Sequence, residues 1–228
     1  MHAVILAAGR GTRMGNLTDS VPKPLLEIAG KSLLAHKLEA LPPEVTEIII
    51  VIGYQGELIK EALGDSYADR PIRYVVQEEL NGTAGALWLC APFLTDRFIV
   101  MMGDDIYAHA DIERAIATSD WAMVVAEVEH MSAGGCVITD PSGRITAIEE
   151  GQHEGKGLIN TNLLALDTRV FSEPMVPKAP GSGEYGLPQT VLAIAEHLSI
   201  PLSAVTASSW IQITAPEDLA VAEQVLSP

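Results

Sequence analysis

The stretch that decides the fold is Ala3-Val4-Ile5-Leu6-Ala7-Ala8-Gly9-Arg10-Gly11-Thr12-Arg13-Met14-Gly15, continued by Pro22-Lys23-Pro24-Leu25-Leu26. An apolar run of strand length ends here in glycines and other small residues. Glycine lets the backbone turn sharply and brings its N–H groups close to whatever lies above the strand. Arg13 and Lys23 add positive charge at the same place. The combination is suited to binding a polyphosphate; the simpler alternative is a tight turn with solvated arginines.

Two familiar phosphate-binding motifs do not match this stretch. A dinucleotide fingerprint needs G-x-G-x-x-G, but its third glycine would fall on Met14, and no acid closes the second strand, where Ile52 runs into Gly53. A P-loop needs G-x-x-x-x-G-K-[ST], and residues 30–32 supply its end, but the leading position is Leu25. The glycines therefore belong to another kind of site.

The composition is that of an acidic globular protein. Its 228 residues carry a net charge of −16, which argues against nucleic acid as a partner. Residues 1–40 nevertheless hold five Lys or Arg against three Asp or Glu, so an anionic ligand would be attracted there. Apolar runs are only of strand length and no basic leader is visible, so we expect no membrane partner. Cys90 and Cys136 have no metal or disulfide spacing, which favours a reducing, cytoplasmic location.

The first half of the sequence alternates between strand and helix patterns. We expect strands at 4–7, 47–52, 72–76 and 97–102, and helices at 31–41, 56–63, 83–94 and 111–117. Continuous β-branched strands between helices predict a parallel sheet covered on both faces. Ligands bind such sheets at the carboxyl ends of the strands. Both the glycine-rich stretch and Gly103-Asp104-Asp105 are expected at such ends.

Strand patterns dominate the second half. We expect strands at 121–128, 135–139, 144–149, 158–166 and 202–205, and helices at 184–198 and 215–226. No linker-like or repetitive sequence separates the halves. We therefore expect a single domain over residues 1–228, whose second half extends the same sheet and covers the ligand.

Two further segments carry candidate chemistry. Gln77 ends the third expected strand, and Gly82 begins the next helix. A glutamine amide suits the edge of a nucleobase, and a glycine lets a flat ring approach the backbone; taken alone, the pattern favours a surface glutamine before an ordinary helix. Asp104 and Asp105 follow the fourth strand, where carboxylates commonly hold Mg²⁺. A capping or turn role is the alternative for them.

These segments resemble those of the sugar-1-phosphate nucleotidyltransferase family, which includes glucose-1-phosphate thymidylyl- and uridylyltransferases and the N-acetylglucosamine-1-phosphate uridylyltransferase domain. The family signature is L-A-A-G-x-G-T-R-[ML] followed by P-K-P-L. The later matches follow in order as Gln77 to Ala84, Gly103-Asp104, Gly135-Cys136-Val137, Ile148-Glu149-Glu150, Ile159-Asn160-Thr161, Gly183-Glu184-Tyr185 and Trp210 to Leu219. Each match is short, but together they cover nearly the whole chain.

The resemblance implies a fold and an activity. The fold is a Rossmann-like three-layer αβα sandwich with a mixed, mostly parallel central sheet. Residues 1–120 form a nucleotide-binding half and residues 121–228 a sugar-phosphate-binding half. The activity is the transfer of NMP from an NTP to a sugar 1-phosphate, which gives NDP-sugar and pyrophosphate. The implied cofactor is Mg²⁺, the implied nucleotide is a pyrimidine NTP, and family habit implies a homodimer.

The resemblance also implies roles for individual residues. Arg13 would bind the leaving pyrophosphate, Lys23 would bridge the α-phosphate and the incoming phosphate, and Asp104 would hold Mg²⁺. The nucleotide-binding residues would be Leu6, Ala7, Ala8, Gly9, Gly11, Thr12, Gln77, Gly82 and Thr83. The sugar phosphate would contact Gly135, Glu150 and Asn160.

Three departures from the family pattern leave the substrate open. Gln212 stands where the closing motif normally has a second metal-binding acid, Gly151 replaces a frequent lysine, and Pro188 replaces a threonine. One alternative is therefore a cytidylyltransferase acting on a non-sugar phosphate or phosphonate. The other is a catalytically weak subunit that binds NDP-sugars and regulates a partner. The base also stays open, because Gln77 could face uracil, thymine, cytosine or a purine.

Overall fold

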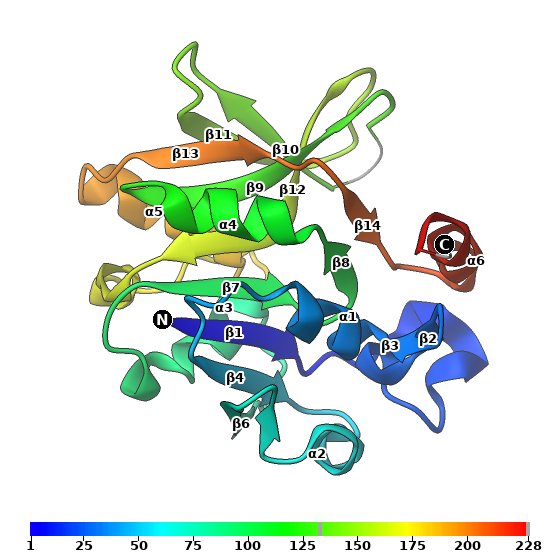
Figure 1. Cartoon of the computed structure of the whole chain (residues 1–228). Coiled ribbons are helices and arrows are strands. Elements are labelled where there is room, and N and C mark those ends of the chain that lie inside the picture. Colours follow the sequence, from blue (N-terminus) through cyan, green and yellow to red (C-terminus); the bar gives the residue numbers. More distant parts are fainter. Residues whose placement is uncertain (132–133, 227–228) are drawn as a thin grey trace.

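Helices pack on both faces of a mixed β-sheet in the computed structural model, which describes residues 1–131 and 134–226 (Figure 1). The strands are β1 (His2–Ala7), β2 (Glu27–Ile28), β3 (Lys31–Ser32), β4 (Glu47–Ile52), β5 (Ser66–Tyr67), β6 (Arg70–Val76), β7 (Phe98–Met102), β8 (Asp105–Tyr107), β9 (Trp121–Val128), β10 (Gly134–Thr139), β11 (Ile145–Gly151), β12 (Gly157–Leu166), β13 (Leu202–Thr206) and β14 (Trp210–Gln212). The α-helices are α1 (Leu33–Ala40), α2 (Gly56–Leu63), α3 (Thr83–Trp88), α4 (His109–Ala117), α5 (Leu187–His197) and α6 (Pro216–Leu226). Short 3₁₀ helices are η1 (Thr12–Thr18), η2 (Lys23–Leu25), η3 (Ala91–Phe93) and η4 (Thr168–Ser172).

Both halves of the chain contribute to one sheet. Ten strands of the described chain join it, in the order β11-β10-β12-β7-β1-β4-β6-β5, with β9 pairing with β12 and β13. β1 lies between β4 and β7 and is parallel to both, so that Ile5 faces Ile50 on one side and Met101 on the other. β12 runs antiparallel to β7 and joins the halves. The expected mixed, mostly parallel sheet is confirmed.

The side chains of β1 point alternately to the two faces of the sheet, and helices pack on both faces to give three layers. Val4 and Leu6 pack into the cluster that includes α3 and α5, whereas Ala3 and Ile5 pack into the cluster that includes α1, α2 and α4. All four side chains are buried. Because both faces of the strand are covered, its sequence is a continuous apolar run without polar alternation. Burying each large aliphatic side chain contributes roughly 1.5–3 kcal/mol.

Two expected helices differ from the structure by three or more residues at one end. The helix expected at 83–94 ends at Trp88, because Pro92 has no N–H to donate to the carbonyl of residue 88. The helix expected at 184–198 begins only at Leu187. The backbone at Tyr185 is instead held by the loop that precedes α3, because the Tyr185 N–H donates a hydrogen bond to the Asn81 carbonyl at 2.8 Å. A distant contact therefore overrides the helical pattern there.

Short antiparallel pairs were not expected from the sequence. β2 and β3 form a hairpin whose turn residues, Ala29 and Gly30, have φ angles of 51° and 75°. Positive φ angles at both residues are those of a type I′ hairpin turn. β14 pairs with β8, so that Gln212 lies opposite Asp105. In Figure 1, α6 lies beside the N-terminal segment that contains η1 and β2, far from it in sequence.

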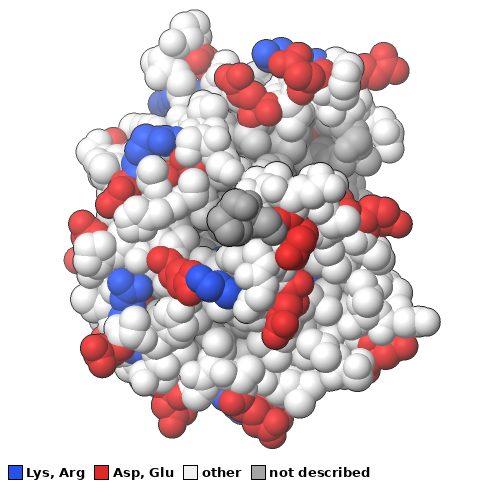
Figure 2. Space-filling view, turned by 45° about the vertical axis from the view of Figure 1, so that its right-hand side comes forward, with Lys and Arg blue, Asp and Glu red and all other residues white. Residues whose placement is uncertain are grey.

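The charged side chains on the surface are mostly acidic. Figure 2 shows Asp and Glu side chains spread over the face in view, with fewer Lys and Arg among them, in keeping with the net charge of −16. Among the helices of residues 1–131 and 134–226, none combines the length and the apolar character that crossing a membrane requires.

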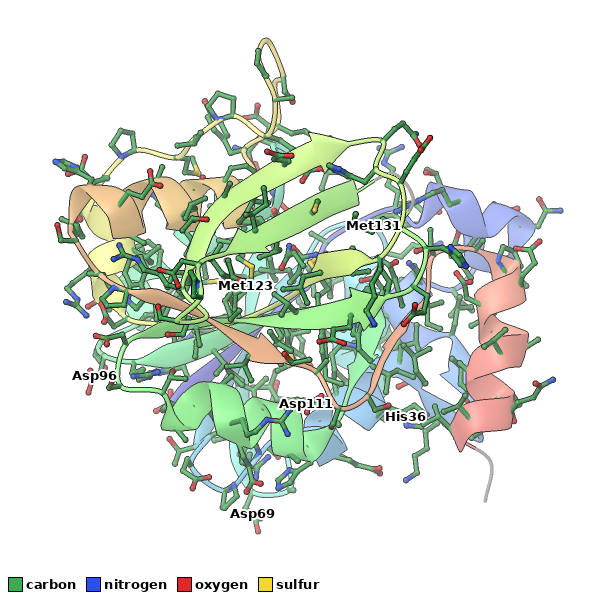
Figure 3. The ribbon with its side chains drawn as sticks, turned by 90° about the horizontal axis from the view of Figure 1, so that it is seen from above. His36, Asp69, Asp96, Asp111, Met123 and Met131 are labelled. Carbon is green, nitrogen blue, oxygen red and sulfur yellow. The ribbon has the colours of Figure 1, made fainter. Side chains whose placement is uncertain are left out.

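The Asp111 carboxylate ties the segment before β14 to α4 (Figure 3). It is only 1% exposed. It accepts hydrogen bonds from the Ser208 N–H at 2.9 Å, the Ser208 hydroxyl at 2.6 Å and the Ser209 N–H at 3.3 Å, and it also pairs with Arg114 at 2.7 Å. Since β14 carries Gln212 toward the carboxyl end of β7, Asp111 fixes the approach of that strand.

We expect Asp111→Ala to lower the free energy of unfolding by about 3 kcal/mol, because the Ser208 N–H, the Ser208 hydroxyl and the Ser209 N–H lose a charged acceptor at once. Urea denaturation followed by circular dichroism measures this change. The matched control is Asp96→Ala, which removes an exposed carboxylate (Figure 3) and should change stability by about 0.5 kcal/mol or less. Equal losses in the two variants would contradict the assignment.

Candidate active site

Four parallel strands, β1, β4, β6 and β7, end along one edge of the sheet. Glycines let the segments after them come very close together. A Cβ at Gly103, after β7, would lie 2.9 Å from the Leu6 carbonyl oxygen, and one at Gly53, after β4, would lie 2.7 Å from the Ala8 carbonyl oxygen. Any side chain there would force the strand ends apart. The glycines thus bring the β1 loop, Asp104 and the end of β4 into contact.

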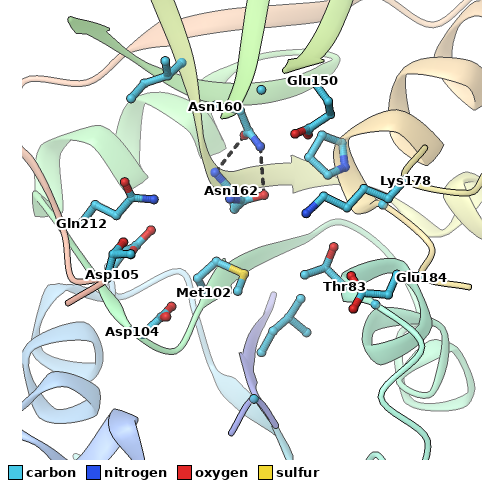
Figure 4. Close-up of a pocket in the computed structure, with 18 of the residues that line it drawn as sticks. Thr83, Met102, Asp104, Asp105, Glu150, Asn160, Asn162, Lys178, Glu184 and Gln212 are labelled. Carbon is cyan, nitrogen blue, oxygen red and sulfur yellow. Dashed lines mark hydrogen bonds between the residues drawn. The ribbon is translucent and has the colours of Figure 1, made fainter. Parts of the chain in front are cut away.

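A cleft of about 790 Å³ opens at this edge (Figure 4). The residues predicted from the sequence that line it are Leu6, Ala8, Gly9, Arg13, Gln77, Gly82, Thr83, Asp104, Gly135, Glu150, Asn160 and Gln212. A pocket of about 180 Å³ shares part of this lining and adds Ala7, Gly11, Thr12 and Lys23. The structure therefore brings together all the residues predicted for the site; the role of each stays a prediction.

Lys23 and Asp104 form an ion pair at the floor of the site. Lys23 is 5% exposed, and its Nζ donates to Asp104 Oδ2 at 2.5 Å and also to the Ile213 carbonyl. The Asp104 side chain keeps 27% of its surface exposed, toward the two cavities that it lines. No group of three His, Cys, Asp or Glu side chains able to hold a metal occurs in the described residues. Mg²⁺ is usually bound through one or two carboxylates plus substrate phosphates and water, so Asp104 fits such an ion.

A second buried lysine lies behind this pair. Lys37 is 1% exposed, and its ammonium donates to the Asp105 carbonyl. Burial lowers the pKa of Lys37 to about 8, against the opposing effect of the two aspartates. Burial and the neighbouring Asp104 carboxylate raise the pKa of Asp105 to about 7, although Trp210 donates a hydrogen bond to it at 3.2 Å. Lys37 was not predicted, but it shares the buried face of α1 with Leu34, and this position could have revealed it.

The loop between β6 and α3 is closed by its own hydrogen bonds. Gln77 is 6% exposed, and its Nε2 donates to Asn81 Oδ1 and to the Gly82 carbonyl, both at 3.2 Å. Both amide hydrogens are thereby used, and within residues 1–131 and 134–226 the amide oxygen accepts no hydrogen bond. The Ala84 N–H donates to the Tyr185 carbonyl at 3.1 Å, so the segment before α5 supports the loop from the other side.

The opposite end of the cleft is lined by polar side chains of the second half (Figure 4). Asn160 Oδ1 accepts from the Asn162 N–H at 2.8 Å, and its Nδ2 donates to Asn162 Oδ1 at 2.9 Å. Glu150 accepts a hydrogen bond from Gln189 at 2.8 Å. Sequence reasoning missed Asn162, Gln189 and Lys178 as lining residues.

We expect Gly82→Ala to lower the free energy of unfolding by about 2–3 kcal/mol. Gly82 has a φ of 101°, and an added Cβ would lie 2.3 Å from the Tyr185 carbonyl oxygen. The control is Gly181→Ala, where φ is 78° but the space is open, so only the backbone cost of about 1–2 kcal/mol applies. Chemical denaturation compares the two; a smaller loss for Gly82→Ala would contradict the close contact.

Known sequences match this chain over most of its length. A family model described as Nucleotidyl transferase matches residues 2–205. The chain is 32% identical to UTP–glucose-1-phosphate uridylyltransferase AglF of Haloferax volcanii, over 99% of this chain and 96% of that protein. It is 31% identical to the bifunctional protein GlmU of Methanocaldococcus jannaschii over 84% of this chain, and it matches only 46% of that longer protein. It is 28% identical to a CMP-5'-(3-aminopropyl)phosphonate synthase of Streptomyces rubellomurinus, over 100% of this chain and 39% of that protein.

A solved structure agrees in fold. A Bacillus anthracis protein assigned as a glucose-1-phosphate thymidylyltransferase superimposes with a TM-score of 0.83 at 23% identity, over 99% of this chain and 95% of that one. Together with the match over residues 2–205 and the full-length similarity to AglF, these observations establish that the chain is an enzyme of the nucleotidyl transferase family.

Proposed function

We propose that this nucleotidyltransferase transfers NMP from an NTP to a sugar 1-phosphate, releasing pyrophosphate and forming an NDP-sugar. The observation that carries the proposal is the continuity of the cleft. Arg13, Asp104 and the glycine loop line one end, and Glu150 and Asn160 line the other. Such a cavity suits a triphosphate in contact with a phosphate ester that is rich in hydroxyls. The similarity to AglF along almost its whole length supports the same assignment.

The mechanism is governed by charge, because both substrates are anions. Two unit charges 4 Å apart repel by roughly 4 kcal/mol at an effective dielectric constant near 20. In our proposal an oxygen of the sugar phosphate attacks the α-phosphorus, and the bond to the β-phosphate oxygen breaks. A phosphate oxygen needs no general base, so positioning and charge neutralisation suffice. Arg13 with the N–H groups of Gly9, Gly11 and Thr12 would bind the leaving pyrophosphate, and Lys23 would neutralise the α-phosphate.

Asp104 is the residue that would hold Mg²⁺, which when bound supplies further positive charge to the phosphates. Its partly exposed carboxylate faces the cleft, and Lys23 already fixes its position. Gln212 would offer only a neutral amide oxygen at the second position. A site with one carboxylate is common for Mg²⁺, because substrate phosphates and water supply the other ligands.

The hydrogen bonds of the Gln77 amide limit which nucleotide base this side chain could bind. Because both of its amide hydrogens are donated within the loop, it can only accept from the base. A ring N–H beside a carbonyl, as in uracil or thymine, suits that acceptor. Guanine presents the same kind of edge, so the choice between these bases is supported by the similarity to AglF, whose name specifies UTP, and we infer that the donor is UTP or dTTP.

Two alternative functions follow from the neutral side chain of Gln212 at the position where the family normally has a second metal-binding acid. A cytidylyltransferase that acts on a phosphonate or other non-sugar phosphate is favoured by the missing acid and by the 28% identity to the phosphonate synthase. An NDP-sugar-binding regulatory subunit would also explain the missing acid. The Lys23–Asp104 pair and Arg13 at the same cleft argue against this second alternative.

A substrate panel separates the three functions. UTP, dTTP, CTP and GTP are each combined with several sugar 1-phosphates and with 3-aminopropylphosphonate, and pyrophosphate release is measured with Mg²⁺ and with EDTA. We expect Mg²⁺-dependent release with a sugar 1-phosphate and UTP or dTTP. Release confined to CTP and the phosphonate identifies the cytidylyltransferase, and binding of NDP-sugar without release under any condition identifies the regulatory subunit.

We expect Arg13→Ala and Lys23→Ala each to lower kcat by about 100- to 1,000-fold, the loss typical of removing a group that stabilises transition-state charge. Pyrophosphate release measures kcat, and circular dichroism confirms the fold. Arg73→Ala and Lys31→Ala remove equal charges away from the cleft and should keep the activity. Near-normal turnover in Arg13→Ala or Lys23→Ala would reject their assigned roles.

A further inference from the structure

β12 departs from regular strand pairing where it reaches the cleft. Between Asn160 and Leu164 its register against β9 shifts, so that the strand bulges over residues 161–163, here called the β12 bulge. Asn162, inside the bulge, has a φ of 58°. Bulges beside active sites commonly redirect side chains. Figure 4 shows the amides of Asn160 and Asn162 together in the cleft, joined by their two hydrogen bonds.

Two buried hydroxyl groups take over the backbone hydrogen bonding at the β12 bulge. On the side of β9, the Thr161 hydroxyl donates to the Val124 carbonyl at 2.8 Å. On the side of β7, the Tyr107 hydroxyl donates to the Thr161 carbonyl at 2.8 Å. Thr161 and Tyr107 are both buried, and a buried carbonyl without a donor is costly. The Thr161 carbonyl therefore depends on Tyr107.

The Tyr107 oxygen also joins the β12 bulge to the end of β7. The direct pairing of β12 with β7 includes Leu164 opposite Val100, and β7 ends at Met102. The Met102 N–H donates to the Tyr107 oxygen at 3.4 Å. One hydroxyl thus contacts the last residue of β7 and the Thr161 carbonyl, and it links the two strands beyond the pair of Leu164 with Val100.

The ring of Tyr107 is held where this contact requires it. The Lys37 ammonium lies 5.8 Å from the ring centroid, within the range of a cation–π interaction. Asp105 Oδ2 lies 3.5 Å from the hydroxyl, farther than the Thr161 carbonyl at 2.8 Å. A tyrosine hydroxyl has a single hydrogen to donate, so the nearer carbonyl receives it. Tyr107 is therefore a fixed donor to the β12 bulge.

We propose that Tyr107 is a positioning residue for the acceptor, because its hydroxyl holds the β12 bulge in the conformation that presents the Asn160 amide to the cleft. This inference rests on the proposed function, in which Asn160 binds hydroxyls of the acceptor. Tyr107 is not among the described residues that line either cavity. It would therefore act through the backbone of the bulge, since the Asn162 N–H of that backbone is bonded to Asn160 Oδ1.

Steady-state kinetics with the best sugar 1-phosphate of the panel tests this role. Tyr107→Phe removes only the hydroxyl. The matched control is Tyr74→Phe, because the Tyr74 hydroxyl donates to the Gly64 carbonyl at 2.6 Å and neither residue lines the cleft. We expect Tyr107→Phe to raise KM for the sugar 1-phosphate about ten-fold, with KM for the NTP changed by about two-fold or less. An unchanged acceptor KM, or an equal rise in Tyr74→Phe, would overturn the proposal.

A double-mutant cycle asks whether Tyr107 acts through Asn160. In an Asn160→Ala background, the amide that the bulge presents is already gone. We expect Tyr107→Phe to raise the acceptor KM by only about two-fold or less in that background, since effects that share one route are not additive. A second ten-fold rise would show that the hydroxyl acts by another route, and the proposal would be rejected.

Amide hydrogen exchange separates this proposal from the proposed function. It is measured over residues 160–163 in the wild type, in Tyr107→Phe and in Tyr74→Phe, while thermal melting shows that all are folded. We expect exchange there to be about ten-fold faster in Tyr107→Phe and unchanged in Tyr74→Phe. If this is observed but no sugar 1-phosphate is turned over, the proposed function fails and the hold of Tyr107 on the bulge stands. Equal exchange in Tyr107→Phe and wild type overturns that hold, whatever the enzyme turns over.

Discussion

Two lysine side chains, Lys23 and Lys37, converge on the segment that follows β7. Lys23 joins the Asp104 carboxylate to the Ile213 carbonyl, and Lys37 donates to the Asp105 carbonyl. Both lysines are almost fully buried. A buried charge without acceptors costs several kcal/mol, so each ammonium requires these partners. The requirement fixes η2, α1 and the approach to α6 against one strand end, and the floor of the cleft follows from it.

The local sequence pattern was enough to predict those helices and strands whose ends are set by nearby residues. β4 and α2 have the expected bounds, because an unbroken apolar run defines the strand and Gly64 ends the helix. The start of α5 could not be found in this way. Tyr185 is held by residues 81–84, and nothing in the residues around Tyr185 encodes that contact. The β8–β14 pair was missed for the same reason, since its two strands are distant in sequence.

Some residues of the candidate site could likewise be predicted from the sequence, and others could not. Residues in ordered motifs, such as Gly9 and Asp104, could be assigned to a strand end and hence to a common edge, where the structure brings them together. Lys37 carried a usable signal, because a lysine on the apolar face of a helix needs an internal partner. Lys178 carried none: it lies in an irregular segment without periodicity, and only the three-dimensional pairing with Glu184 brings it to the cleft.

The pairing of residues 176–178 with residues 184–186 also has a consequence for how the cleft of this protein could be altered. Tyr185 belongs to that pairing, and both its N–H and its carbonyl are bonded to residues 81–84. Residues 176–186, on one wall of the cleft, and residues 81–84, on another, are therefore held together by backbone hydrogen bonds. If residues 176–186 were replaced by the corresponding segment of a relative, we expect residues 77–84 to be displaced unless they were exchanged as well. A substitution that shifts either segment is therefore expected to shift the other as well.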